Sequence, residues 1–212
     1  MATVSYGLKI TEAYHIFDKT IKIYRNAVHY ISDIAIRHYD ELKSLESITG
    51  DDGKVIISAQ QRRQQKMERL IHSTASNDAV YKRFDKEFYK FPSYLRRDAI
   101  NTAIGLILSY RSQLQKLEDD GKHGRRPYLN RNQNTMPCFY RNNTFLDSKE
   151  TNIVSLKLYN GKDWIWETFA IRDCDFMYAY SHMKEWKASA PVLVKRNHRY
   201  ELRISYEMAN SK

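Results

Sequence analysis

Apolar side chains recur every three or four positions through most of residues 11–120, which is the spacing of one buried helical face. The pattern predicts a long helix from Thr11 to about Ser47, a mostly polar helix over Ser58–His72 and a short helix within Asn77–Lys90. The clearest stripe lies in Phe91–Glu118, where Ser93 stands at the expected N-cap, so we expect a helical lobe. The small or apolar positions of this last stripe are Ala99, Ile100, Ala103, Ile104, Ile107, Leu108, Leu114 and Leu117.

The rest of the chain alternates with a period of two, which indicates half-buried β-strands. One such strand, Thr3–Ile10, precedes the helices, and the others follow residue 134. Because an isolated strand needs a sheet to cover its apolar face, we expect the first strand to join the C-terminal ones. The later predicted strands are a pair within Thr135–Leu146 around Arg141-Asn142-Asn143, then Asn152–Tyr159, Trp164–Phe169 after the Asn160-Gly161 hairpin signal, Pro191–Arg196 and Tyr200–Met208.

These elements together indicate an α+β fold, in which a small antiparallel β-barrel or sandwich carries an inserted α-helical lobe. Residues 1–10 supply the first strand, residues 11–120 the inserted helical lobe, residues 121–134 a connecting loop and residues 135–212 the remainder of the β lobe. The connecting loop is rich in turn formers and in basic residues, so we expect it to be exposed.

The charge of the chain points to a class of partner. Lys and Arg total 35 against 25 Asp and Glu, a formal net charge of +10, which favours an anionic partner such as nucleic acid. The 16 tyrosines add side chains that can stack on bases, although most of them are expected in the core or in strands. A basic protein that is merely soluble stays open as an alternative, because net charge does not determine a fold.

Two helical segments concentrate basic residues. The segment Ser58–His72 places its cations largely away from a thin apolar edge, which is typical either of a cationic binding helix or of a solvated charged face. Arg96 and Arg97 lie in the first turn of a predicted helix, where the helix dipole disfavours cations. We infer that this pair has another partner, or else that both side chains are exposed to solvent.

Few residues suggest catalysis. The sequence contains neither a GxxxxGK[ST] nor a GxGxxG phosphate-binding pattern, and no HExxH. Asp173 and Asp175 flank Cys174, but they fall in a predicted connection and not at the end of a core strand, where a metal-dependent nuclease holds its carboxylates. We therefore expect no catalytic residues, no metal site and no cofactor.

The sequence also bears on the cellular compartment. Cys138 and Cys174 are far apart and form no CxxC pattern, so we expect thiols in a reducing compartment. No apolar run approaches the roughly 18 residues needed to span a bilayer. Residues Met1–Ile10 lack the basic start and apolar core of a signal peptide. These observations predict a cytoplasmic protein without a membrane partner.

Four segments resemble a known family. They read FPSYLRRDAINTAIGLILSYRSQLQ, CFYRNNTFL, LKLYNGKDWIW and PVLVKRNHRYELRISYE, and they resemble the N-terminal half of TnpB or OrfB proteins. Those proteins are transposon-encoded RNA-guided nucleases related to type V CRISPR effectors. The resemblance implies that a first strand opens a wedge-like β-barrel, that a helical recognition lobe is inserted, and that the barrel is then completed. In the family a RuvC-like nuclease domain and a zinc ribbon follow, whereas this sequence ends at Lys212, so we expect a truncated or split relative.

The resemblance also implies positions for nucleic-acid contacts. The duplex that carries a short transposon-adjacent motif would lie between two sets of residues, Arg96, Arg97 and Asn101 on one side and Tyr140, Arg141 and Asn142 on the other. Guide RNA or phosphate would be held by Arg111, Lys122, Arg125, Arg126 and Arg131. Arg and Asn can pair bidentately with purine edges, and each good pair contributes about 1–3 kcal/mol of base discrimination.

The resulting hypothesis is a protein that binds guide RNA and double-stranded DNA with a short adjacent motif, without nuclease activity of its own. One alternative is half of a split RNA-guided endonuclease that needs a separate RuvC-like chain. Another is a helical scaffold or interaction protein, which the seam of apolar residues between Tyr14 and Leu45 would support.

Overall fold

The computed structural model describes residues 3–11, 15–121, 123–129, 135–148, 151–182, 185–197 and 199–208. The fold is α+β, and its chain divides into two compact units. We call Met1–Tyr24, Pro92–Leu95 and Met136–Lys212 the β unit, and Arg25–Phe91 and Arg96–Thr135 the helical unit.

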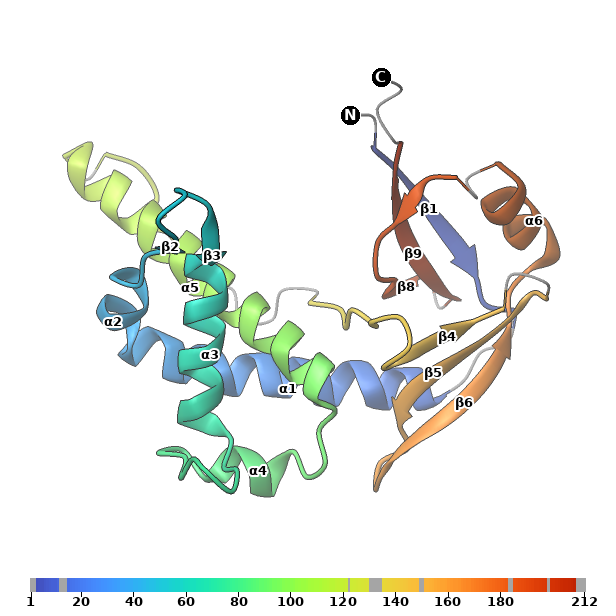
Figure 1. The fold of residues 1–212 in the computed structure, drawn as a ribbon, viewed down its shortest axis with the longest axis horizontal. Coiled ribbons are helices and arrows are strands. Elements are labelled where there is room, and N and C mark those ends of the chain that lie inside the picture. Colours follow the sequence, from blue (N-terminus) through green and yellow to red (C-terminus); the bar gives the residue numbers. More distant parts are fainter. Residues whose placement is uncertain are drawn as a thin grey trace. The chain divides into compact units, whose positions relative to one another are not determined.

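The first strand pairs with the last one. In the β unit, β1 (Thr3–Lys9) runs antiparallel to β9 (Arg199–Glu207), in a register that extends from Thr3 opposite Glu207 to Lys9 opposite Glu201 (Figure 1). The short β7 (Lys187–Ala188) and β8 (Val192–Arg196) also pair with β9. The prediction that the N-terminal strand joins the C-terminal sheet is therefore confirmed.

A second antiparallel sheet consists of β4 (Phe145–Asp147), β5 (Ile153–Tyr159) and β6 (Trp164–Ala170). The Asn160-Gly161 signal does mark the connection between β5 and β6, whose last pair is Tyr159 opposite Trp164. Gly161 adopts a φ of 106°, a left-handed conformation that a residue without Cβ tolerates best.

The predicted α+β class with small antiparallel sheets is confirmed, and no closed barrel is found among the described strands. A bridge between Ile10 and Ile171, with neighbouring backbone hydrogen bonds, connects the end of β1 to the end of β6, and Cys138, which precedes β4, bridges Val192 in β8. The inner faces meet through Phe17, whose ring centroid lies 4.7 Å from that of Phe169 in β6 and 4.8 Å from that of Tyr200 in β9. The start of α1 (His15–Arg37) thus supplies a side chain that fills the core of the β unit.

Two local predictions in the β unit differ from the structure. The strand pair expected around Arg141-Asn142-Asn143 is reduced to one bridge between Arg141 and Phe145, because Asn142 turns the chain with a φ of 62°. The connection expected near Cys174 is instead a helix, α6 (Asp173–His182). The carboxylate of Asp175 joins this helix to β1, since it accepts hydrogen bonds from the Lys9 amide at 3.0 Å and the Tyr6 hydroxyl at 3.1 Å.

The helical unit contains the second part of α1, α2 (Tyr39–Lys43), α3 (Ala59–Ile71), α4 (Arg83–Glu87) and most of α5 (Ser93–Asp119). The predicted continuous helix over residues 11–47 is broken at His38, where φ is −103° and ψ is 20°. The ring of His38 hydrogen-bonds Tyr81 at 3.0 Å, a contact between distant parts of the chain. A small hairpin of β2 (Ile48–Thr49) and β3 (Val55–Ile57) lies between α2 and α3.

The core of the helical unit follows the predicted stripe of α5. The first five positions of that stripe, from Ala99 to Ile107, are buried, but Leu114 and Leu117 near the end of the helix are only half-buried. Tyr30, Phe84, Phe88 and Phe91 form an aromatic group in the same unit, with ring centroids 4.8–6.1 Å apart. Among the described residues, no helix is both long enough and apolar enough to cross a bilayer.

Candidate nucleic-acid interface

Arg96 is held inside the helical unit and is not displayed on its surface. Its residue is only 8% exposed, and Nε and Nη2 donate to Oε1 of Glu68 in α3 at 3.2 and 2.9 Å. Nη1 donates to the carbonyl oxygen of Phe91 at 3.4 Å. The sequence suggested a partner for this badly placed cation, and the structure supplies it in Glu68, so the expectation of an exposed side chain is wrong.

Arg97 and Asn101 lie near the same cluster. Arg97 is 45% exposed, and its Nε lies 3.6 Å from the other carboxylate oxygen of Glu68. Asn101 donates to Gln64 at 3.3 Å, while its own amide oxygen is buried and has no hydrogen-bond partner within the described chain. The structure therefore brings together the three predicted residues of α5, but only Arg97 presents much charge to solvent.

Arg111 packs against an aromatic ring. Its guanidinium carbon lies 4.9 Å from the ring centroid of Tyr39 in α2, a cation–π contact. Its buried Nε has no hydrogen-bond partner among the described residues. Arg111 is half-buried, and this contact explains how a cation can interrupt the apolar stripe of α5.

The basic residues of α3 stabilise the neighbouring helix α2. Arg62 donates to the carbonyl of Glu46 at 2.8 Å, and Arg63 donates to the carbonyls of Leu42 and Leu45 at 2.8 and 3.3 Å. Of these acceptors, Leu42 lies in the last turn of α2, and Leu45 and Glu46 follow the end of that helix. The interpretation of α3 as a cationic binding helix loses support, because these two guanidinium groups already have acceptors within the unit.

The connecting loop differs from these clusters, because its two described arginines have no partners among the described residues. Arg125 and Arg126 are exposed, and in the described part of the chain neither forms an ion pair or a hydrogen bond. Lys122 and Arg131, which were predicted to act with them, lie outside the described residues. Exposed guanidinium groups without a carboxylate partner are available to bind phosphate.

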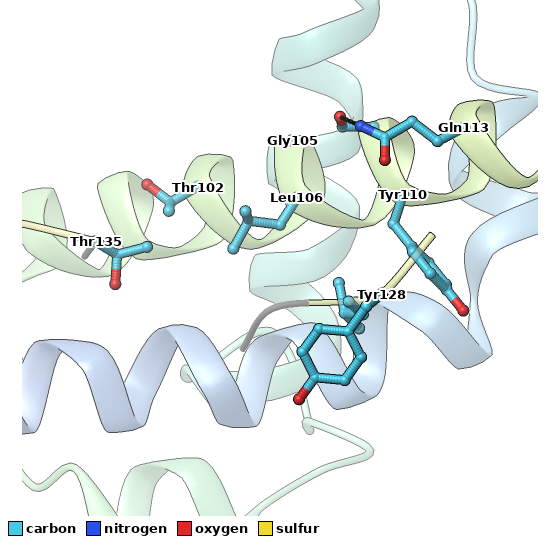
Figure 2. A pocket seen from close by; sticks show the side chains of 9 residues that line it. Thr102, Gly105, Leu106, Tyr110, Gln113, Tyr128 and Thr135 are labelled. Atoms are coloured by element: carbon cyan, nitrogen blue, oxygen red, sulfur yellow. Dashed lines mark hydrogen bonds between the residues drawn. The ribbon is translucent and has the colours of Figure 1, made fainter. Parts of the chain in front are cut away.

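The loop also forms one wall of a groove on α5 (Figure 2). The groove has a volume of about 330 Å³ and lies entirely within the helical unit. Its helical wall consists of residues three or four positions apart, opposite the buried stripe, and its other wall includes Tyr128 and Leu129. The residues that line it are Thr102, Gly105, Leu106, Ser109, Tyr110, Gln113, Tyr128, Leu129 and Thr135.

The groove combines aromatic rings with neutral polar groups. Tyr128 is 83% exposed, and Figure 2 shows Tyr110 and Leu106 on the side of α5 toward Tyr128. The amide of Gln113 contacts the hydroxyl of Ser109 at 3.5 Å. None of the lining side chains is a carboxylate, a lysine or an arginine. Cations nevertheless lie close by, since Arg25 donates to the backbone carbonyl of Thr135 at 3.1 Å and Arg125 and Arg126 precede Tyr128 in the loop. The groove was not predicted, and the only sequence signal for it was a glycine within a strong helical pattern.

The predicted contacts in the β unit form a tight turn. The backbone N–H of Asn142 donates to the carbonyl oxygen of Phe145 at 2.8 Å, and the backbone N–H of Tyr140 donates to the Thr144 hydroxyl at 2.8 Å. The guanidinium of Arg141 is paired with the carboxylate of Asp147 and lies 5.1 Å from the ring centroid of Phe145. Arg141 therefore has an internal acceptor, unlike Arg125 and Arg126, which have none among the described residues.

Asp147 and its neighbours are arranged as a structural network. The hydroxyl of Tyr180 in α6 donates to the same carboxylate that Arg141 contacts. Burial first, and then this carboxylate, raise the pKa of the Tyr180 hydroxyl far above its usual range, so Tyr180 stays protonated. The network ties the turn at Asn142 to α6.

The two aspartates beside Cys174 both have partners within the β unit. Asp175 is 1% exposed and is paired with Arg172 at 2.6 Å. Burial alone would raise the pKa of the Asp175 carboxyl, but hydrogen bonds from Arg172 and the Lys9 amide outweigh it and hold the pKa below its usual value. Within the described residues, no group of three or more His, Cys, Asp or Glu side chains is placed to hold a metal ion.

Comparison with known proteins places the chain in one family. No curated protein matches this chain closely enough to be taken as a relative. The family model described as the Aq_aa04 family matches residues 2–160, which include β1, the whole helical unit, β4 and β5. The matched segment contains all of the groove and the connecting loop. Because the match covers most of the sequence, the chain belongs to the Aq_aa04 family.

Proposed function

We propose that this protein is a nucleic-acid-binding module related to TnpB proteins, which holds guide RNA and recognises double-stranded DNA through a short adjacent motif. Cleavage is not part of the proposed role, and a separate nuclease-domain chain is the partner that would supply it. The match to the Aq_aa04 family says nothing about a relationship to TnpB proteins. The proposal therefore rests on the exposed arginines of the loop and on the resemblance of the sequence.

The observation that carries the proposal is the pair Arg125 and Arg126. Both are exposed and lack partners in the described chain, whereas Arg62, Arg63, Arg96 and Arg141 are satisfied within the protein. A protein with a formal charge of +10 that leaves adjacent arginines unpaired beside aromatic side chains has the features of a single-stranded RNA site. We assign phosphate contact to these two residues.

Recognition of the DNA motif is proposed for a smaller set than the sequence suggested. Arg97 is the most exposed of the three predicted residues in α5, and Asn101 is nearby, whereas Arg96 supports them through Glu68. In the β unit, Tyr140, Arg141 and Asn142 are proposed as the second set of contacts. Arg141 would have to exchange Asp147 for a base edge, which lowers the gain expected from that contact.

We also propose that the β unit acts as an open, wedge-like barrel. The isolated bridges Ile10–Ile171 and Cys138–Val192 lie where the two sheets would have to join to close such a barrel. The chain order of one strand, an inserted helical unit and then the remaining strands agrees with the wedge and recognition lobes of the TnpB family.

The proposal can be tested by the salt dependence of RNA binding. Fluorescein-labelled single-stranded RNA of mixed sequence is titrated with the wild type and with the double variant Arg125→Ala/Arg126→Ala at several salt concentrations. Each phosphate contact contributes about −0.7 to the slope of log K against log salt concentration. The double variant, which loses two contacts, should therefore have a slope shallower by about 1.4. A wild-type affinity that does not change with salt would refute the proposal.

A matched variant controls for net charge. Lys82→Ala/Arg83→Ala also removes two exposed cations from the helical unit, but these are paired with Asp78 and Glu87. This control should keep the wild-type salt slope. If both double variants lose the same slope, the loop has no special role and binding reflects overall charge alone. Competition between duplexes with randomised flanks then measures whether any DNA motif is preferred.

A further inference from the structure

Gly105 is an unexpected residue for its position. It lies in the middle of α5, a helix of 27 residues, where glycine is about 1 kcal/mol less favourable than alanine. A Cβ built at Gly105 meets no atom within 4 Å, and the backbone there is ordinary right-handed helix. Neither close packing nor backbone conformation therefore requires glycine at this position.

A side chain at position 105 would project into the groove. Gly105 is exposed and lines the groove together with Thr102, Ser109 and Gln113 on the same helical face. Figure 2 shows Gly105 between Thr102 and Gln113 along α5. The absence of a side chain keeps this part of the groove open, at the expense of helix stability. This is the pattern expected where a ligand approaches the helix backbone closely.

The lining chemistry restricts the ligand. Because no lining side chain carries a charge, a phosphate group inside the groove would have no counter-charge, whereas a neutral planar ring with donors and acceptors on its edge would be matched. Tyr110 and Tyr128 offer aromatic faces, and Ser109 and Gln113 offer hydrogen bonds. A volume of about 330 Å³ lies at the lower end of the range of about 300–1,000 Å³ for ligand sites, which is too small for a duplex.

The arginines of the loop indicate what the ring is attached to. Arg125 and Arg126 precede Tyr128 by three and two residues, and all three are exposed. A nucleotide whose base entered the groove would leave its phosphates outside it, available to the exposed cations of the loop segment that leads into Tyr128. The charged and neutral parts of a nucleotide thus correspond to the charged loop and the neutral groove.

We propose that the groove over Gly105 binds a single unstacked base of single-stranded RNA, with Tyr110 and Tyr128 as stacking partners and Gly105 as the floor. This inference rests on the proposed function, because it assumes that RNA is held by Arg125 and Arg126. It adds a base-binding subsite to a surface that otherwise contacts phosphate alone.

The test fills the groove without removing any charge. Gly105→Leu places a side chain over the floor, and leucine favours helix formation, so its thermal midpoint should equal or exceed that of the wild type. The probe is single-stranded RNA that carries one 2-aminopurine, whose fluorescence is quenched on stacking. Gly105→Leu should bind it about 5- to 150-fold more weakly, the range for losing one stacked base, and should lose the quenching seen with the wild type.

Two controls define the comparison. Ser112→Leu introduces the same side chain at an exposed position of α5 that does not line the groove, and it should bind RNA like the wild type. Gly105→Ala adds a single methyl group that clashes with nothing. It should raise the thermal midpoint while weakening RNA binding less than leucine does, and it provides the comparison if the leucine variant does not fold.

The outcomes separate this inference from the proposed function. Filling the groove should weaken affinity equally at every salt concentration and leave the salt slope unchanged, whereas Arg125→Ala/Arg126→Ala should change the slope. If Gly105→Leu binds as tightly as the wild type and quenching is unaltered, the base subsite is refuted while phosphate binding stands. If the wild type shows no salt-dependent RNA binding, the proposed function fails and the subsite fails with it.

Discussion

The pair Arg96 and Arg97 offers a sharp test of the structure, because two adjacent arginines in one helical turn have opposite environments. Arg96 is 8% exposed and makes two hydrogen bonds to Glu68, whereas Arg97 is 45% exposed and lies 3.6 Å from the same carboxylate. From the sequence alone, both were candidates for exposed side chains whose removal would not affect folding. The structure predicts that only Arg97 behaves in that way.

The expected size of the effect follows from the contacts. Removing one partner of a buried ion pair destabilises a protein by about 3–5 kcal/mol, because the other charge is left uncompensated. Glu68 is 22% exposed, so water and Arg97 can partly replace the lost guanidinium. We therefore expect Arg96→Ala to lower the free energy of unfolding by about 2–4 kcal/mol. Arg97→Ala removes a surface pair and should cost about 0–1 kcal/mol.

Urea denaturation followed by circular dichroism measures both variants. A double-mutant cycle with Glu68→Gln isolates the pair, and it should give a coupling energy of about 1–3 kcal/mol for Arg96 and below about 1 kcal/mol for Arg97. The slope of unfolding free energy against urea must agree among the variants for the comparison to hold. Equal destabilisation by the two alanine substitutions would contradict the buried contact between Arg96 and Glu68.

Two further predictions concern the β unit. Asp175→Asn should weaken the attachment of α6 to β1 and lower the free energy of unfolding by about 1–3 kcal/mol near neutral pH, as measured by urea denaturation. The pKa of Asp175 is lowered in the folded state, so its ionised form contributes stability above the unfolded pKa of about 3.9, and this is lost as pH falls through the folded pKa. The difference between wild type and Asp175→Asn should therefore shrink below about pH 4, and a constant difference would argue against the ion pair. Phe17→Ala should cost about 3–5 kcal/mol, because its ring packs on both Phe169 and Tyr200 at once, and a loss below about 1 kcal/mol in thermal or urea unfolding would show that the sheets do not share this core.

The periodicity of apolar residues was sufficient to predict those helices and strands whose surroundings are the same along their whole length. The helix over Ser58–His72 was expected from its spacing, and α3 begins after Ser58, whose hydroxyl accepts from the Gln61 amide in a capping box. The alternation of Tyr200–Met208 similarly predicted β9, which pairs with strands on both sides. In such segments the local preference and the tertiary contacts favour the same structure.

Contacts between distant residues decided the cases in which the predictions differed from the structure. The apolar seam over residues 11–47 is compatible with one helix, and the break at His38 coincides with its hydrogen bond to Tyr81, more than forty positions away. The segment at Cys174 has a weak pattern of its own, and Asp175 joins it to β1 as a helix. Periodicity within one segment contains no information about such partners.

The sequence likewise predicted one part of the candidate site, and the tertiary structure decided the other. Composition and the turn-rich stretch after Asp119 were enough to predict an exposed basic loop, because basic residues and turn formers can be read from the local sequence. Which arginines keep their charge available was decided only by tertiary structure, since Glu68 and Asp147 satisfy Arg96 and Arg141 but no described residue satisfies Arg125 or Arg126. The groove likewise exists because Tyr128 and Leu129 lie against the face of α5 that contains Gly105, and this proximity of residues distant in sequence is a property of the folded chain.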